Sequence, residues 1–278
     1  MPRDLDLDLE NNRERETASP PTLSESPNRM SGPSSPEPTK AFTINSMSSS
    51  KVTGNLHPYV RPLTISDLDS CEALENSAFS EVERASREKL RYRLTKCGEL
   101  CIGLFTTVVP SPKCLQSPTL GAARLVESCR DDGAVSVMLG HVVSSKTTSP
   151  TCTDASMDYP KDWESTIGDV KKGQDDLSGH GAIGHQEQGR TVVLHSVAIA
   201  PGFQGRGMGG VLMKSYISSI AGSGVADRLA LLAHEEKVEW YEKLGFVSKG
   251  PSAVKGCGGN WIDMVYEVKK PEARARYG

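Results

Sequence analysis

A glycine-rich loop between an apolar strand and a helix is the feature that most limits how this chain can fold. Residues 191–200 form a nearly uninterrupted apolar run, which is typical of a strand buried on both faces in the centre of an α/β sheet. Glycines then recur through residues 204–210, and a helical pattern continues to residue 221. Glycine permits positive φ angles and a close approach of backbone to ligand, and amide groups at a helix start attract anions. The loop therefore predicts a site for a phosphate or pyrophosphate group.

The remaining patterns predict a single α/β domain built around this strand. Further strand patterns lie at residues 61–63, 100–109, 135–143, 228–234, 246–249 and 261–268. Helical patterns lie after Thr64 and at residues 86–96 and 238–244. Strands followed by helices, with antiparallel pairing at the start and the finish, indicate a mixed sheet with helices packed against it.

The composition indicates that this domain does not use all 278 residues. Only 37% of the chain is hydrophobic and 5% is aromatic, below the roughly 45–50% apolar content of globular proteins. Residues 1–56 are rich in Ser, Pro and charge, which predicts a disordered tail. Apolar periodicity disappears near residues 110–119 and 144–189, which predicts two insertions in a domain at 57–270. Residues 271–278 are expected to be a flexible basic end.

Charge and cysteine content exclude several functional classes. A net charge of −3 argues against a dedicated nucleic-acid binder. No apolar run approaches the ~18 residues of a membrane-spanning helix. The acidic start of the chain is unlike a presequence, so we expect a cytoplasmic or nuclear protein. Seven cysteines without a CxxC pair predict reduced thiols, with neither a disulfide framework nor a metal site.

Two ligand motifs overlap in the glycine loop. Gly205, Gly207 and Gly210 satisfy the GxGxxG pattern of dinucleotide-binding folds. That pattern also requires an acidic residue at the end of the next strand, about 20 residues further on. Asp227 precedes its strand and Glu235 lies too far along, so the dinucleotide interpretation fits poorly. A tight turn that binds no ligand is the remaining alternative.

The second motif resembles the acetyl-CoA loop of the GNAT N-acetyltransferases. It consists of Gln204-x-x-Gly207-x-Gly209 and is followed by Tyr241-x-x-x-Gly245-Phe246, which is similar to another segment of that family. Stretches at residues 60–64, 75–79 and 194–198 resemble the arylalkylamine (serotonin-type) branch, and the resemblance covers about residues 58–270 without the insertions. The long insertion, with its Thr-Thr-Ser-Pro sequence, is similar to one in fungal members.

This resemblance implies a fold and a co-substrate. The fold is of the α/β (α+β) type, with a mixed, mostly antiparallel seven-stranded sheet whose two central parallel strands splay apart. The implied co-substrate is acetyl-CoA, whose pantetheine arm pairs with unpaired strand groups much as an added strand would. The residues implied to hold it are Val197, Ala198, Ile199, Gln204, Gly205, Arg206, Gly207, Met208 and Gly209.

Acetyl transfer to an amine requires a base, because the amine's pKa is about 10 and only the free amine attacks. An imidazole ordinarily titrates near neutrality, and His195 matches one of the family's two histidines by resemblance. The other position is Val193 here, which argues against a two-histidine relay. Tyr241 matches the general acid. Both residues could instead be core packing, and His234 is a rival base. The remaining histidines lie in the predicted tail, insertions or an outer strand and receive no role.

We therefore expect direct acetyl transfer to a small primary amine, with Phe79, His195 and Trp261 lining the acceptor by resemblance. An arylalkylamine is the favoured acceptor, and a polyamine or a protein lysine are alternatives. A CoA-binding or interaction protein without catalysis is an alternative of another class. No Arg-Arg-x-Thr or Arg-Arg-x-Ser phosphosite is present, so we expect no phospho-dependent adaptor. We expect a monomer that binds neither nucleic acid nor membrane.

Overall fold

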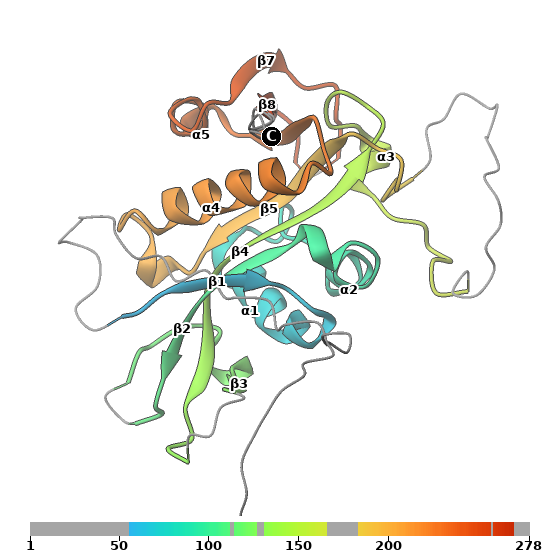
Figure 1. Ribbon diagram of the computed structural model, residues 1–278. Coiled ribbons are helices and arrows are strands. Elements are labelled where there is room, and N and C mark those ends of the chain that lie inside the picture. Colours follow the sequence, from blue (N-terminus) through green and yellow to red (C-terminus); the bar gives the residue numbers. More distant parts are fainter. Residues whose placement is uncertain (1–55, 112–113, 127–130, 166–182, 257, 270–278) are drawn as a thin grey trace, which may run out of the picture. The chain divides into compact units, whose positions relative to one another are not determined.

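The computed structural model describes residues 56–111, 114–126, 131–165, 183–256 and 258–269, shown in colour in Figure 1. Almost all of the predicted tail, the predicted basic end, Cys129 and Cys257 lie outside the described residues. The predicted strands and helices are present, with ends shifted by a few residues. Among the described residues no helix is long and apolar enough to cross a membrane.

One mixed sheet forms the centre of the domain. Its strands are β1 (Tyr59–Pro62), β2 (Ile102–Val108), β3 (Arg124–Leu125), β4 (Val135–Thr147), β5 (Thr191–Ile199), β6 (Arg228–Ala233), β7 (Val247–Pro251) and β8 (Ile262–Glu267). The order is β1-β2-β4-β5-β6-β8-β7, with β3 beside β4, and every pair except β5–β6 is antiparallel. The sheet thus has eight strands, one more than expected, because the two-residue β3 is too short to leave a pattern.

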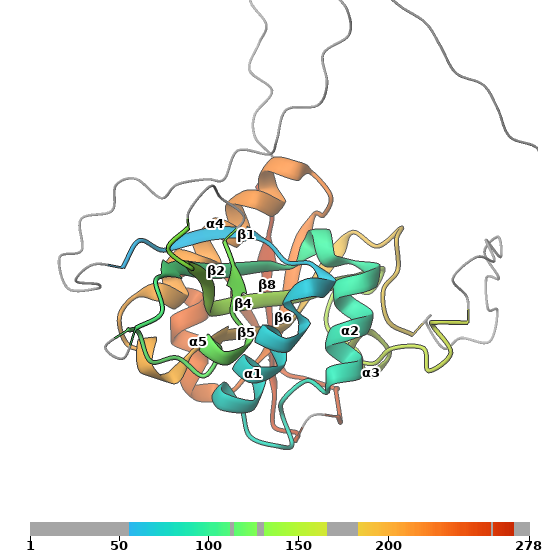
Figure 2. The same cartoon turned by 90° about the horizontal axis from the view of Figure 1, so that it is seen from below.

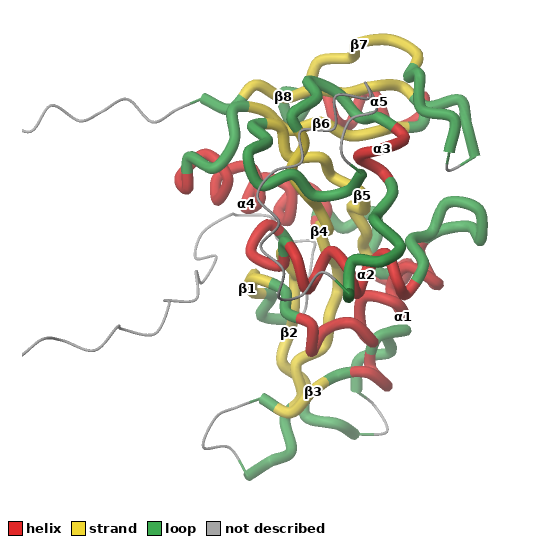
Figure 3. Tube along the Cα trace, turned by 90° about the vertical axis from the view of Figure 1, so that its right-hand side faces the viewer, coloured by secondary structure: helices red, strands yellow, loops and turns green. Residues whose placement is uncertain are grey.

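Helices cover both faces of this sheet. They are α1 (Leu68–Ala78), α2 (Arg87–Lys96), α3 (Asp154–Met157), α4 (Met208–Ser223) and α5 (Glu235–Glu242), with short 3-10 turns at Ile65–Asp67, Gly98–Leu100, Leu120–Ala122 and Pro201–Phe203. Figures 2 and 3 show α1 and α2 on one face and α4 on the other. The main core lies between these helices and β2, β4, β5 and β6.

The predicted insertion at 144–189 begins later than its sequence pattern indicated. β4 continues to Thr147, where its polar residues pair with the first half of β5, and Ser144, Ser145 and Thr147 are buried. The hydroxyl of Ser144 lies 2.7 Å from that of Tyr216 and donates to the Leu100 carbonyl at 2.6 Å. These hydrogen bonds let a polar stretch occupy the core, which periodicity alone cannot indicate. Further along, Trp163 is also buried, while residues 166–182 lie outside the described part.

The parallel strands β5 and β6 separate along their length. They pair only from Thr191–Arg228 to Leu194–Leu231, although β5 continues to Ile199 and its other edge stays paired with β4. Beyond Leu194 no strand of the described part pairs with the edge of β5 that faces β6. This geometry confirms the expected splay and opens a gap in the centre of the sheet.

Gly140 on β4 lies directly against β5, where there is no room for a side chain. Its replacement by Ala should therefore destabilise the fold. An added Cβ would lie 2.7 Å from the Ala198 carbonyl oxygen and collide with Ile199. We expect the free energy of unfolding to fall by about 1–3 kcal/mol, as overpacked cores do. Denaturant unfolding measures this change. Gly121→Ala is the matched control, because a Cβ there meets nothing within 4 Å. If Gly140→Ala were as stable as Gly121→Ala, the close contact between Gly140 and β5 would not limit the side chain at this position.

Candidate functional site

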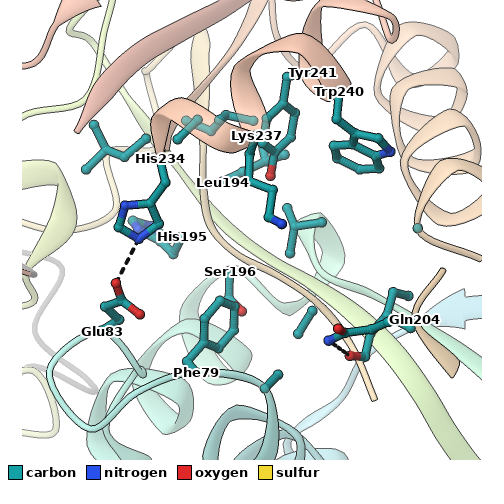
Figure 4. A pocket seen from close by; sticks show the side chains of 18 of the residues that line it. Phe79, Glu83, Leu194, His195, Ser196, Gln204, His234, Lys237, Trp240 and Tyr241 are labelled. Carbon is teal, nitrogen blue, oxygen red and sulfur yellow. Dashed lines mark hydrogen bonds and ion pairs between the residues drawn. The ribbon is translucent and has the colours of Figure 1, made fainter. Parts of the chain in front are cut away.

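A cavity of about 740 Å³ lies in the gap between β5 and β6 (Figure 4). One wall comes from α1 and the loop after it, and the others come from β5, the glycine loop, the end of β6 and α5. The sequence-predicted residues that line it are Phe79, His195, Val197, Ala198, Ile199, Gln204, Gly205, Gly207, Gly209, Tyr241 and Trp261, with the rival base His234. Segments far apart in the sequence therefore meet at one site.

The glycine loop has the backbone conformation that its composition predicts. Gly205 and Gly207 have φ angles of 71° and 80°, which L side chains rarely adopt, and Gly207 is the N-cap of α4. A Cβ on Gly209 would lie 3.3 Å from the Trp240 ring, so glycine permits close packing of α5 against the loop. The loop therefore presents the amino end of a long helix to the cavity, which suits an anionic group.

Two predicted loop residues do not line the cavity. The exposed Arg206 places its guanidinium 5.5 Å from the centre of the Phe203 ring. Met208 is 3% exposed and belongs to the core. Gln204 does line the cavity, and its side-chain amide donates to the Ile199 carbonyl at 2.9 Å, on the strand where pantetheine is expected.

His195 lies at the cavity with one ring nitrogen engaged. Its Nε2 is 2.7 Å from the Ser145 hydroxyl, and its Nδ1 is buried without a hydrogen-bond partner. Burial lowers the pKa of His195 well below its ordinary value, and the charge of Arg93 lowers it further. The imidazole is therefore neutral at neutral pH, as a proton acceptor must be.

Val193 is the residue at which the resemblance implies a second histidine. It is fully buried and packs with Cys152, Ala230, Val254 and Val265 in a second apolar cluster. It is not part of the cavity lining. His195 therefore has no imidazole partner at this position of β5.

Tyr241 joins the cavity from α5 and is 9% exposed. Its ring packs edge-on against Trp240 and Phe246, with centroid distances of 4.8 and 5.5 Å. Burial raises the pKa of Tyr241 above its ordinary value, so the phenol keeps its proton at neutral pH. Trp240 and Lys237 also line the cavity from this short helix and were not predicted (Figure 4).

The rings of His234 and Trp261 are in contact at the cavity, tilted by 33° with their centres 4.0 Å apart. His234 Nε2 lies 2.7 Å from Glu83 Oε1, across from Phe79 (Figure 4). Partial burial would raise the pKa of Glu83, but hydrogen bonds from Ser80 and His234 outweigh it and lower that pKa. The rival base is thus held by a carboxylate and an aromatic ring.

Sequence reasoning missed three buried polar residues at this site. Glu75 and Ser196 line the cavity, and His141 contacts both from β4. The expectation that His141 belongs to an outer strand is wrong, because β4 lies between β2 and β5. The sequence signal that could have identified His141 is a single histidine within an otherwise apolar strand. No cluster of three His, Cys, Asp or Glu able to hold a metal occurs among the described residues.

Comparisons with known proteins agree with this geometry. Residues 170–268, which include the glycine loop and β5 to β8, match the family model of the acetyltransferase (GNAT) domain. Serotonin N-acetyltransferase from Mesocricetus auratus is 36% identical over 70 residues, which are 25% of this chain and 34% of that protein. The enzyme of the same name from Macaca mulatta is 30% identical over a match of the same length. The chain thus matches about a third of these curated relatives, 34% of each.

Solved structures of low sequence identity are also similar. The loading GNATL domain of CurA from Lyngbya majuscula is 14% identical with a TM-score of 0.48, over 76% of this chain and 98% of that one. The ribosomal-protein-S18-alanine N-acetyltransferase from Escherichia coli is 14% identical with a TM-score of 0.41, over 80% and 99%. On the family match and the sheet described above, residues 170–268 of this chain are similar to a GNAT acetyltransferase domain.

Proposed function

We propose that this protein transfers the acetyl group of acetyl-CoA directly to a small primary amine. The observation that carries the proposal is the cavity where β5 and β6 separate, which joins an anion-binding glycine loop to His195 and Tyr241. A helix amino end, unpaired strand groups and two proton-transfer candidates are what such a reaction requires.

The residues at the gap fit acetyl-CoA, which would supply an activated acetyl thioester. The amides of Gly205 to Gly209 would hold its pyrophosphate at the start of α4. The free edge of β5 at Val197 and Ile199 would pair with the pantetheine arm, which has its own amide groups. For that pairing the Gln204 amide would leave the Ile199 carbonyl, with which it now bonds.

His195 is the proposed base and Tyr241 the proposed acid. A neutral imidazole at the cavity can accept the proton that the amine nitrogen loses. A protonated phenol can donate to the departing thiolate, and burial keeps Tyr241 in that state. No cysteine of the described part lines the cavity, and burial raises the pKa of Cys101 to about 12. These features favour direct transfer over an acetyl-cysteine intermediate.

An arylalkylamine is the acceptor that the cavity suits best. Phe79 and Trp261 line it and offer aromatic surfaces to a ring. Glu83 and Glu236 also line it, which favours a polyamine as the second candidate. Val193 stands where the resemblance implies a second histidine. A protein that binds CoA without catalysis is therefore the alternative from another functional class.

A panel assay tests this function. Purified full-length protein is incubated with acetyl-CoA and tryptamine, phenethylamine, spermidine or a histone peptide, and thiol release is followed. We expect turnover with the arylalkylamines and less with the others. Acetyl-CoA binding without thiol release on any amine would refute the enzyme and leave the binding role.

A further inference from the structure

A buried carboxylate forms part of the cavity wall on the acceptor side. Glu75, on α1, is 1% exposed and lines the cavity together with Phe79 from the same segment. The Ser196 hydroxyl donates to Glu75 Oε1, and the Ala85 amide donates to Oε2 at 2.8 Å. His141 Nε2 lies 3.0 Å from Oε1. The carboxylate is therefore fixed from three segments of the chain.

His141 holds this carboxylate from β4. The imidazole is fully buried, and its Nε2 is within 3.0 Å of both Glu75 Oε1 and the Ser196 hydroxyl. Its Nδ1 is buried with no hydrogen-bond partner. A proton on Nδ1 would be a buried donor without an acceptor, which is costly, so the contacts assign the ring proton to Nε2. His141 therefore donates to Glu75 through Nε2.

Glu75 is a buried anion. Burial alone would raise its pKa, but the hydrogen bond and Coulombic attraction of His141, with hydrogen bonds from Ser196 and the Ala85 amide, outweigh burial and lower it. A carboxylate has about four acceptor positions, and the three contacts leave one of them unused. A buried charge is stabilised most by an opposite charge with good hydrogen-bond geometry. The matching ligand is a cation that donates hydrogen bonds.

We propose that Glu75 anchors the ammonium group of the acceptor amine, and that His141 is the positioning residue that aims and holds the carboxylate. The inference rests on the proposed function, because it concerns how the amine is recognised. It separates two tasks: Glu75 binds the charged amine, and His195 accepts the proton before attack. It also selects primary amines over neutral molecules of the same shape.

Ligand binding with free CoA tests the anchor without turnover. The probes are tryptamine and tryptophol, in which a hydroxyl replaces the amine, and calorimetry gives both dissociation constants. We expect the wild type to prefer tryptamine and Glu75→Gln to lose roughly 10- to 100-fold of that preference, as for a charge-assisted hydrogen bond. Acetyl-CoA affinity should not change. Glu72→Gln, one turn earlier on α1 and paired at the surface with Arg87, should behave as wild type.

Two variants of His141 test positioning. Gln can still donate to Glu75 and should keep most of the preference for tryptamine. Leu cannot donate and should lose nearly as much as Glu75→Gln. Thermal unfolding of each variant shows whether it is folded, and a role in packing alone would alter stability without altering the ratio of the two dissociation constants.

The outcomes separate this inference from the proposed function. If the wild type acetylates amines and Glu75→Gln keeps the tryptamine preference, the anchor is refuted and the proposed function stands. If the preference depends on Glu75 but no amine is acetylated, the anchor stands and the catalytic proposal fails. A wild type that binds both probes equally would overturn the anchor.

Discussion

Replacing Gly207 with Glu is expected to lower the affinity for acetyl-CoA at least ~100-fold, because the negative charge would occupy the proposed pyrophosphate site. Gly207 is the N-cap of α4 and lines the cavity together with Gly205 and Gly209. A carboxylate there would meet the pyrophosphate with like charge. A Cβ at Gly207 meets nothing within 4 Å, so the fold should survive. Isothermal titration with acetyl-CoA measures the loss.

Two controls separate charge from backbone strain. The φ angle of 80° at Gly207 penalises any side chain, by about 1–3 kcal/mol. Gly207→Ala has this strain without the charge and should retain much more affinity. Gly222→Glu places the same carboxylate near the other end of α4, where a Cβ meets nothing within 4 Å, and should bind normally. Unchanged affinity in Gly207→Glu would refute the loop as the cofactor site.

Replacing His195 with Gln should lower kcat near pH 7 by roughly 10²- to 10⁴-fold, the usual contribution of a general base. The loss should shrink at high pH, where more of the amine is already deprotonated. The pKa of His195 is depressed, so wild-type His195 should stay neutral, and remain a base, as the pH falls from 7 through the ordinary histidine range. Turnover measured across pH 5.5 to ~10 with saturating acetyl-CoA shows both effects.

The pH dependence distinguishes chemistry from packing. If His195 only fills space beside Ser145, the variant would lose the same fraction of activity at every pH. His57→Gln is the matched control, since His57 is exposed and outside the cavity. It should reproduce the wild-type profile.

The parts of the site that were predictable are those fixed by local sequence. The loop at Gly205 and Gly207 needs positive φ angles, and only glycine supplies them freely, so its composition is informative. The apolar run of β5 likewise indicates a central strand. The mixed, mostly antiparallel sheet predicted from these patterns is confirmed by the observed strand order. The roles of His195 and Tyr241 stay predictions.

The parts that were missed depend on contacts between distant segments. Glu75 and Ser196 are 121 residues apart, and His141 lies between them on a strand that resembled an edge. Nothing local distinguishes a buried, hydrogen-bonded Glu from a surface one. The polar end of β4 was misplaced for the same reason, since Ser144 becomes a core residue only through Tyr216 and Leu100.

The short pairing between β5 and β6 has a mechanical consequence. Among the described residues, one half of the sheet, β1-β2-β4-β5, pairs with the other, β6-β8-β7, along the Thr191–Leu194 stretch, next to the Arg190 carbonyl that accepts from Asp227 and Arg228. A ligand bound in the cavity where β5 and β6 no longer pair would contact both halves of the sheet and hold them together. A ligand that binds only the folded state stabilises it by RT ln(1 + [L]/Kd). The rise in the thermal unfolding temperature with ligand concentration should therefore report how much of the protein has a ligand bound between β5 and β6.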